Sequence, residues 1–161
     1  TLGNGLVPVR NDPEHSLEIE LPFLQRALAG SFKLVPVMLR AQEPEVSKAL
    51  GEALAVLAAE EDTLLVASSD LSHYYDQETA AVLDRTMLAE FEAMSPEGIF
   101  RTEFSGKGFA CGMAAVAAVL WAAMDLGANQ VKILNYGTSG DITGDPSAVV
   151  GYGAAAILKT A

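Results

Sequence analysis

Stretches with helical spacing of apolar residues alternate along this chain with short apolar runs bounded by polar residues. Four leucines from Leu17 to Leu28 recur every three or four positions, which is typical of one helix face, with Asp12 as expected N-cap and Pro13 in the first turn. The predicted helices are 12–28, 45–60, 76–94, a short one opening at Ser95, and 111–126, and the predicted strands are 31–40, 62–67, 131–136 and 148–158. This order predicts an α/β fold, a layered sheet with helices on both faces, as a single domain over residues 1–161.

Charge and cysteine content narrow the classes of function. The formal net charge of −11 argues against a nucleic acid or an anionic membrane as partner. A lone cysteine, Cys111, excludes an internal disulfide and favours a reducing compartment, so a cytoplasmic protein is expected. The longest uncharged stretch, 108–124, is short for a membrane span and is better interpreted as a buried helix.

A polar cluster follows the predicted strand 62–67. It contains Ser68, Ser69, Asp70 and His73, at the strand end where α/β sheets place their ligands. A carboxylate three residues before an imidazole can orient the ring and raise its basicity, which favours a general base. The alternative is a turn in which these side chains satisfy local backbone groups.

Two further groups of residues are candidates for chemistry. Glu14, His15 and Glu18 share one face at the start of the first predicted helix, where they can hold a metal, donate to a substrate, or simply be solvated. Cys111 opens a predicted helix, a position that favours metal binding or nucleophilicity, although a small buried apolar residue is an equal alternative. Phosphate-loop and serine-hydrolase motifs are absent from the sequence.

Five groups of residues, in this order and across nearly the whole chain, resemble motifs of the Memo family. They are Glu14-His-Ser-Leu-Glu18 with Leu21-Pro-Phe-Leu24, Ser68-Ser-Asp-Leu-Ser-His73, Cys111-Gly112, Leu134-Asn-Tyr136 and Ser147-Ala-Val-Val-Gly-Tyr-Gly-Ala154. Microbial Memo proteins are often called AmmeMemoRadiSam system protein B. Their fold is similar to that of the class III extradiol dioxygenases, and the resemblance implies that fold here.

The resemblance implies a non-haem iron or copper site used for redox or dioxygenase-type chemistry on a small phenolic or redox substrate. It gives Cys111 the role of metal ligand. It makes His73 a general base that Asp70 orients. The wall of the pocket is expected to include Glu14, His15, Glu18, Ser68, Ser69 and Tyr136.

The sequence departs from the family in one respect. The two metal histidines of the family lie upstream of the Glu-His-Ser motif and have no counterpart here, so the resemblance covers only the C-terminal part of the family's fold. A second chain or an N-terminal segment is therefore expected to cover open sheet edge and apolar surface. Two non-enzymatic alternatives are a phosphopeptide adaptor, for which only Lys107 and Arg101 are candidate cationic contacts, and a protein partner of a radical-SAM enzyme.

Overall fold

The computed structural model describes residues 6–11 and 13–161. Its helices are α1 (Ser16–Ala27), α2 (Pro44–Glu60), α3 (Gln77–Glu92), α4 (Pro96–Phe104), α5 (Met113–Asp125) and the short α6 (Ser139–Thr143). The first five confirm the helices expected from apolar spacing and, for α4, from its Ser95-Pro96-Glu97 start. Helix α1 begins at Ser16 rather than at Pro13, and the expected cap Asp12 lies outside the described residues.

Side-chain caps fix the starts of α3 and α4. The carboxylate of Asp76 accepts a hydrogen bond from the Thr79 N–H at 3.0 Å. The hydroxyl of Ser95 accepts one from the Gly98 N–H at 3.2 Å, and Pro96 occupies the first turn of α4, where its missing N–H costs nothing. Both helices therefore begin where local sequence directs them.

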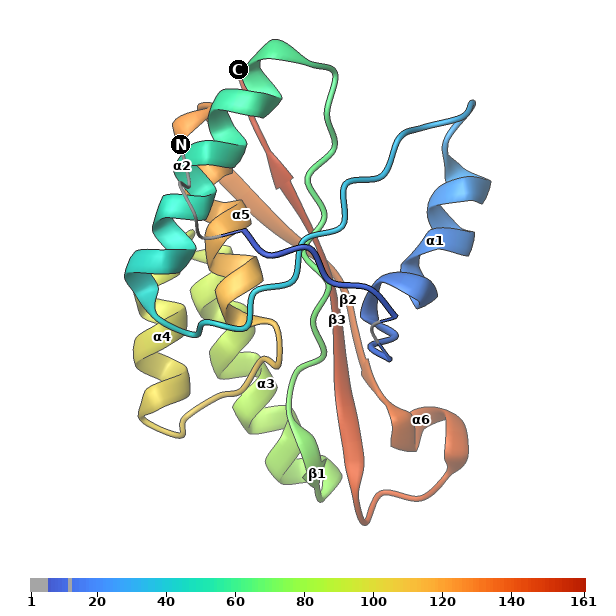
Figure 1. Cartoon of the computed structure of the whole chain (residues 1–161). Helices are drawn as coiled ribbons and strands as arrows, with labels where there is room; N and C mark the ends of the chain where they lie inside the picture. The colour runs from blue at the N-terminus through green and yellow to red at the C-terminus, as the bar shows by residue number, and fades with distance from the viewer. Residues whose placement is uncertain (1–5, 12) are drawn as a thin grey trace.

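Three strands form one antiparallel sheet in the order β1-β3-β2. These strands are β1 (His73–Tyr75), β2 (Gln130–Thr138) and β3 (Val149–Leu158). The long β2–β3 pair runs through the centre of the molecule, and the short β1 pairs with the beginning of β3 (Figure 1). The mixed α/β class is thus confirmed, and β2 and β3 match two of the four predicted strands.

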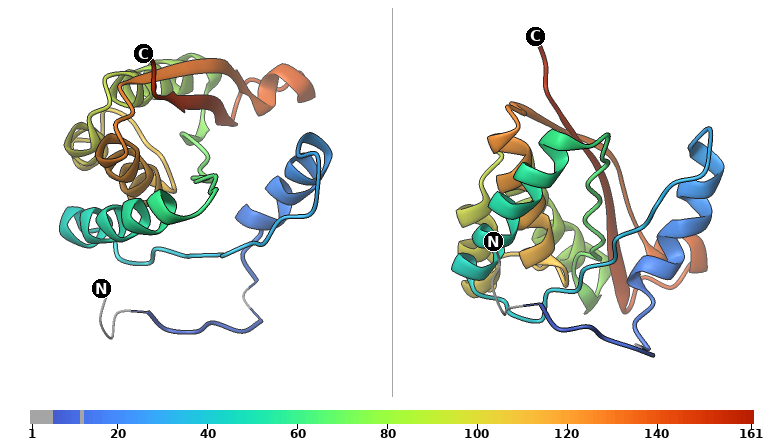
Figure 2. Two further views of the ribbon diagram at one scale, coloured as in Figure 1. Left: turned by 90° about the horizontal axis from the view of Figure 1, so that it is seen from above. Right: turned by 45° about the horizontal axis from the view of Figure 1, so that its top comes forward.

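Two predicted strands and the expected layering were wrong within the described residues. Segments 31–40 and 62–67 are extended but pair with no strand, and α1 has no buried residue. Helix α1 stands apart from the group formed by α2, α3, α4 and α5, and the segment after α2 runs between that group and α1 (Figures 1 and 2). The physical reason is that a strand needs a hydrogen-bonding neighbour as well as a suitable sequence.

The core lies among the grouped helices rather than between two layers over a wide sheet. Helix α3 packs on β2 and β3, α4 on α3, α5 on α4, and α2 on α5. Met87, Ile99 and Leu120 are fully buried there. Helices α2 and α5 approach closely because position 51 is glycine: a Cβ at this position would lie 2.7 Å from the Ala118 carbonyl oxygen. In the described part of the chain, no helix has both the length and the apolar character needed to cross a membrane.

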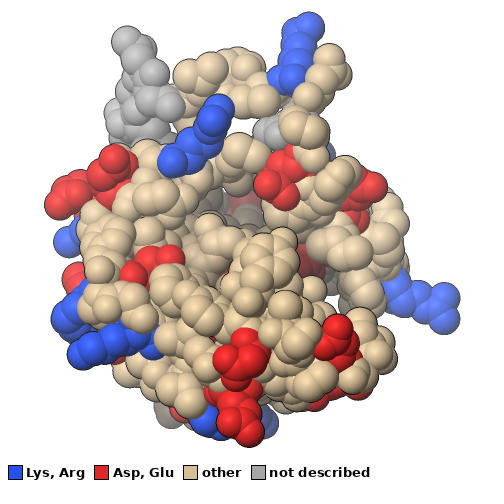
Figure 3. Space-filling model, turned by 90° about the horizontal axis from the view of Figure 1, so that it is seen from below, with Lys and Arg blue, Asp and Glu red and all other residues tan. Residues whose placement is uncertain are grey.

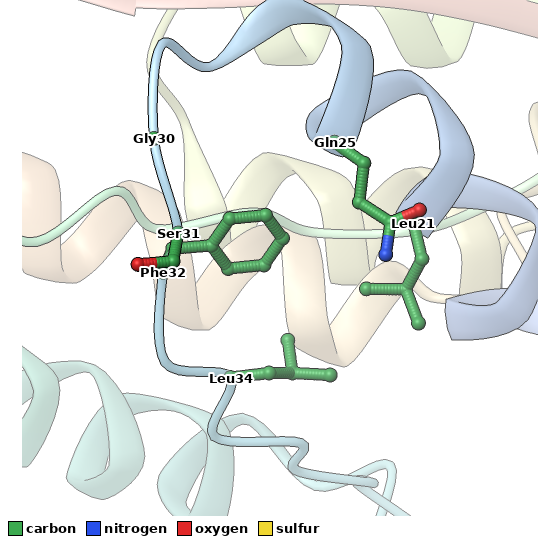
Figure 4. Close-up of a pocket in the computed structure, with 6 residues that line it drawn as sticks. All are labelled: Leu21, Gln25, Gly30, Ser31, Phe32 and Leu34. Atoms are coloured by element: carbon green, nitrogen blue, oxygen red, sulfur yellow. The ribbon is translucent and has the colours of Figure 1, made fainter.

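A pocket of about 400 Å³ lies between α1 and the extended segment that follows it. Leu21 and Gln25 of α1 face Phe32 and Leu34 across this pocket (Figure 4). Its walls carry no histidine, cysteine or acidic side chain, so the candidate chemistry described below lies elsewhere.

Candidate metal centre

The polar segment after 62–67 is held in place by the edge of β3. The Leu71 N–H donates to the Gly151 carbonyl oxygen and the Gly151 N–H donates to the Ser72 carbonyl oxygen, each at 2.9 Å. His73 then opens β1 opposite Val150. These backbone bonds fix the direction in which the Asp70 and His73 side chains leave the chain.

Cys111 meets this segment from the start of α5. The Cys111 N–H donates to the Asp70 carbonyl oxygen at 3.1 Å, and the Asp70 N–H donates to the Cys111 Sγ at 3.1 Å. The hydroxyl oxygen of Ser69 accepts the Gly112 N–H at 2.9 Å and lies 3.8 Å from the same sulfur. Reciprocal backbone contacts therefore hold the sulfur against residues 69–70, although the two segments are distant in sequence.

The structure brings Asp70, His73 and Cys111 together. One ligand atom from each lies within 4.8 Å of the others, and this is the one such group of histidine, cysteine and acidic side chains found within the described residues. Nε2 of His73 lies 3.5 Å from Oδ2 of Asp70, longer than a good hydrogen bond. This nitrogen is also buried, and no hydrogen-bond partner for it is found within residues 6–11 and 13–161. A buried polar atom without a partner is costly, so its position needs an explanation.

A divalent metal fits these three side chains. Sulfur, imidazole nitrogen and carboxylate oxygen are ligand atoms suited to iron or copper. An incoming group, either an ion or a substrate hydroxyl, would give Nε2 of His73 a partner. Asp70, His73 and Cys111 are called the metal cluster below.

Glu14, His15 and Glu18 lie outside the metal cluster, at the exposed start of α1. Nδ1 of His15 pairs with Glu18 Oε2 at 2.9 Å, and the hydrogen bond and charge of Glu18 raise the pKa of His15. The Glu14 carboxylate accepts the His15 and Ser16 N–H groups at 2.8 and 3.0 Å. The hydroxyl of Ser68 donates to the Ser16 carbonyl oxygen at 3.0 Å, so the start of α1 touches the segment that carries the cluster.

Tyr136 is bonded to a buried acid and is not one of the residues of the metal cluster. Its hydroxyl donates to Oδ2 of Asp84 at 2.8 Å, and burial, followed by the hydrogen bond to Asp84, raises the pKa of this tyrosine. Asp84 is fully buried on α3 and did not figure among the candidates from sequence. A signal was available, because Asp84 lies four positions after Ala80 and three before Met87, on the apolar face of its helix.

Glu103 supports the loop that leads to Cys111. Its carboxylate accepts the Ala110 N–H at 2.8 Å, and burial raises its pKa although this hydrogen bond lowers it. A raised carboxyl pKa in the folded state contributes stability below the unfolded value of 4.5, and this contribution is lost as the pH rises through the folded pKa.

Replacing Glu103 with glutamine is therefore expected to remove a pH dependence of stability. The amide can still accept the Ala110 N–H but has no charge to bury. Relative to the parent chain, Glu103→Gln should gain free energy of unfolding between about pH 4 and about pH 7. Urea unfolding of both chains at the two pH values checks this, and a difference independent of pH would contradict it.

Seen from below, the surface of the molecule has a hollow (Figure 3). Most of the side chains around this hollow are uncharged or acidic; one basic side chain lies near its upper edge, and the other Lys and Arg side chains in this view lie toward the outline (Figure 3). Such a surface offers little for the recognition of a phosphate group, which needs cationic partners.

Comparison with known proteins gives a consistent assignment. Residues 8–156 match the family model described as Memo-like protein. A "MEMO1 family protein" of Nitrosopumilus maritimus is 40% identical over 141 residues, which cover 88% of this chain and 51% of the relative. One of Methanococcoides burtonii is 39% identical over 148 residues (91% and 55%), and one of Aquifex aeolicus is 38% identical over 139 residues (86% and 52%). The chain spans about half the length of these curated relatives.

Proposed function

Because the chain belongs to the Memo-like protein family, we propose that its metal cluster is part of a non-haem iron or copper redox site. The observation that carries this proposal is the convergence of Asp70, His73 and Cys111 within 4.8 Å from separate segments. Nε2 of His73 is buried and has no hydrogen-bond partner within the described residues, which suits a base that takes a substrate proton beside the ion. The rest of the family's longer chain, or a second chain, would supply the remaining protein ligands.

Each residue of the cluster has a distinct role in this proposal. Cys111 holds the metal through its sulfur, which residues 69–70 keep in place. When bound, iron or copper supplies Lewis acidity and a route for electrons. His73 accepts the proton of a phenolic hydroxyl group, and the Asp70 carboxylate, 3.5 Å from Nε2, orients the ring. The Ser69 hydroxyl fixes the start of α5 through Gly112.

Titration with ferrous iron under anaerobic conditions tests this proposal. Cys111→Ala is expected to lower iron affinity at least about a hundredfold, because a ligand is lost. His73→Ala is expected to keep most of the iron affinity and to lower, by about 100-fold or more, the rate at which a catechol probe is oxidised by O₂ admitted after iron loading. Glu92→Gln, on the exposed surface of α3, is the matched control and should change neither.

The two variants also separate the two roles open to His73. An equal loss of affinity in His73→Ala and Cys111→Ala would make His73 a ligand rather than a base. Unchanged iron affinity in Cys111→Ala would remove the basis of the proposed function.

A further polypeptide segment is proposed to cover the extended segments of this chain. Leu64 and Val66 are 65% and 45% exposed, and Val35 in the other segment is 81% exposed. Within the described residues, the backbone groups of 62–67 have no hydrogen-bond partner. Extended apolar chain with a free backbone is suited to the addition of a strand.

Amide hydrogen exchange is expected to detect the unpaired backbone of 62–67 directly. The amides of 62–67 should exchange rapidly in the 161-residue chain, whereas those inside α5 should be protected. In a longer Memo-like chain that aligns with this one, the equivalent amides should be protected. Equal, slow exchange in both proteins would contradict the proposed strand addition.

A further inference from the structure

We propose that Asp84 is a positioning residue for the metal cluster, acting through the backbone of Ser72. Asp84 is fully buried on α3, and its Oδ1 accepts the Ser72 N–H at 2.8 Å. Its Oδ2 accepts the Tyr136 hydroxyl at 2.8 Å. No salt bridge to Asp84 is found in the described part of the chain, so these two donors compensate much of the cost of burying its carboxylate.

A hydrogen bond to the Ser72 amide restrains the backbone that carries residues of the metal cluster. Ser72 directly precedes His73, and its carbonyl oxygen accepts the Gly151 N–H at 2.9 Å. The same short segment contains the Asp70 N–H, which donates to the Cys111 sulfur at 3.1 Å. Asp84 on one side and β3 on the other therefore fix the backbone that carries two of the three side chains of the cluster.

Strand β3 passes very close to the Asp84 carboxylate at Gly151. A Cβ at position 151 would collide with the Asp84 carboxylate, so glycine allows β3 to pass close to it. The carboxylate thereby joins α3, β2 and the segment before β1 at one buried point. A buried acid that served only to pack α3 would not need donors from two other elements.

This inference rests on the proposed metal site, but its first test does not need metal. Amide hydrogen exchange is measured at Ser72 and Asp70 in Asp84→Ala and in Asp84→Asn. In Asp84→Ala both amides are expected to exchange at least about tenfold faster, although only that of Ser72 is bonded to residue 84. Asp84→Asn should show a smaller rise at both, because a neutral acceptor is weaker than a carboxylate.

Thr102→Val is the matched control for the loss of a buried polar contact. The hydroxyl of Thr102 donates to Glu90 Oε1 at 3.3 Å, a bond that joins α4 to α3 and includes no residue of the metal cluster. This variant should leave exchange at Ser72 and Asp70 unchanged. If Asp84→Ala does not fold, the same comparison is made with Asp84→Asn.

An unchanged rate at Asp70 with a faster rate at Ser72 would overturn the positioning role, because the disturbance would not reach the cluster. The second measurement is Co²⁺ affinity, which should fall about tenfold in Asp84→Ala or severalfold in Asp84→Asn. Undiminished Co²⁺ affinity in a variant with faster Asp70 exchange would also overturn it. If the parent chain binds no Co²⁺, the three side chains of the cluster do not hold an ion without further ligands, and the exchange rates alone decide whether Asp84 orders the segment.

Discussion

Replacing Gly112 with alanine is expected to weaken iron binding at the metal cluster strongly while the helical core stays folded. A Cβ at this position would lie 2.5 Å from the Ser68 carbonyl oxygen and 2.9 Å from the Ser69 Cβ. Both contacts are with the segment that carries the cluster, and one is with backbone, which cannot rotate away. The start of α5 must therefore separate from residues 68–69.

Two consequences of Gly112→Ala can be measured separately. The hydrogen bond from the Gly112 N–H to the Ser69 oxygen should break, and Cys111 should move away from Asp70. We expect iron affinity to fall at least about a hundredfold, as for loss of a ligand, and the free energy of unfolding to fall by about 1–3 kcal/mol. Iron titration and urea unfolding give the two quantities.

Gly30→Ala is a suitable control for this glycine substitution. A Cβ there would meet no atom within 4 Å, so iron affinity and stability should both stay close to those of the parent chain. Iron affinity in Gly112→Ala within about threefold of the parent value would show that the close approach of α5 to residues 68–69 does not shape the site.

Replacing Gly151 with alanine is expected to cause the largest loss of stability among these substitutions. The new methyl group would occupy the space of the Asp84 carboxylate. This carboxylate is held in place by its hydrogen bonds to Ser72 and Tyr136. The backbone of Gly151 is itself held by Leu71 and Ser72. We expect a loss of about 3 kcal/mol or more in free energy of unfolding.

A double substitution tests the cause of this loss. In Gly151→Ala combined with Asp84→Ala, the methyl group and the carboxylate no longer compete for space. The two losses should therefore combine to less than their sum, with a coupling energy of about 1 kcal/mol or more. Urea unfolding of the parent chain, both single variants and the double variant gives this coupling. Additive losses would place the strain of Gly151→Ala elsewhere.

The helices were predictable because their signals are local. Apolar residues repeat at helical spacing in α2 and α3, and Asp76 and Ser95 supply caps at the positions where α3 and α4 begin. The strands β2 and β3 were also recognised, and they pair with each other over nearly their whole length. Elements that contain their own signals, or that pair with the next strand in sequence, can be located without knowledge of the rest of the fold.

The strands predicted at 31–40 and 62–67 failed for a physical reason. Their composition suits a buried strand, but a strand exists only when another backbone accepts its hydrogen bonds, and the described residues offer none. The expected layer of helices on both faces failed with them. The pattern of apolar residues indicates that a segment can be buried as a strand. It does not indicate whether a neighbouring strand is present to form its hydrogen bonds.

Some residues of the candidate site could be predicted from the sequence and others could not. Asp70 and His73 stand three residues apart beside an apolar run, so local order alone made them a candidate pair. The expectation that Cys111 lies beside them came from the resemblance to the Memo family. The family match confirms that resemblance. Asp84 was missed because its role depends on Ser72 and Tyr136, whose approach is set by tertiary structure.

The most direct test of the central claim is whether an ion bound by Cys111 lies next to His73. Co²⁺ is added to the chain, and its thiolate absorption is recorded together with the imidazole NMR signals of the chain's two histidines. We expect a thiolate-to-cobalt band, large paramagnetic shifts of the His73 ring that exceed those of His15, and loss of both effects in Cys111→Ser. A thiolate band with an unshifted His73 ring would place the ion elsewhere and contradict a common metal centre.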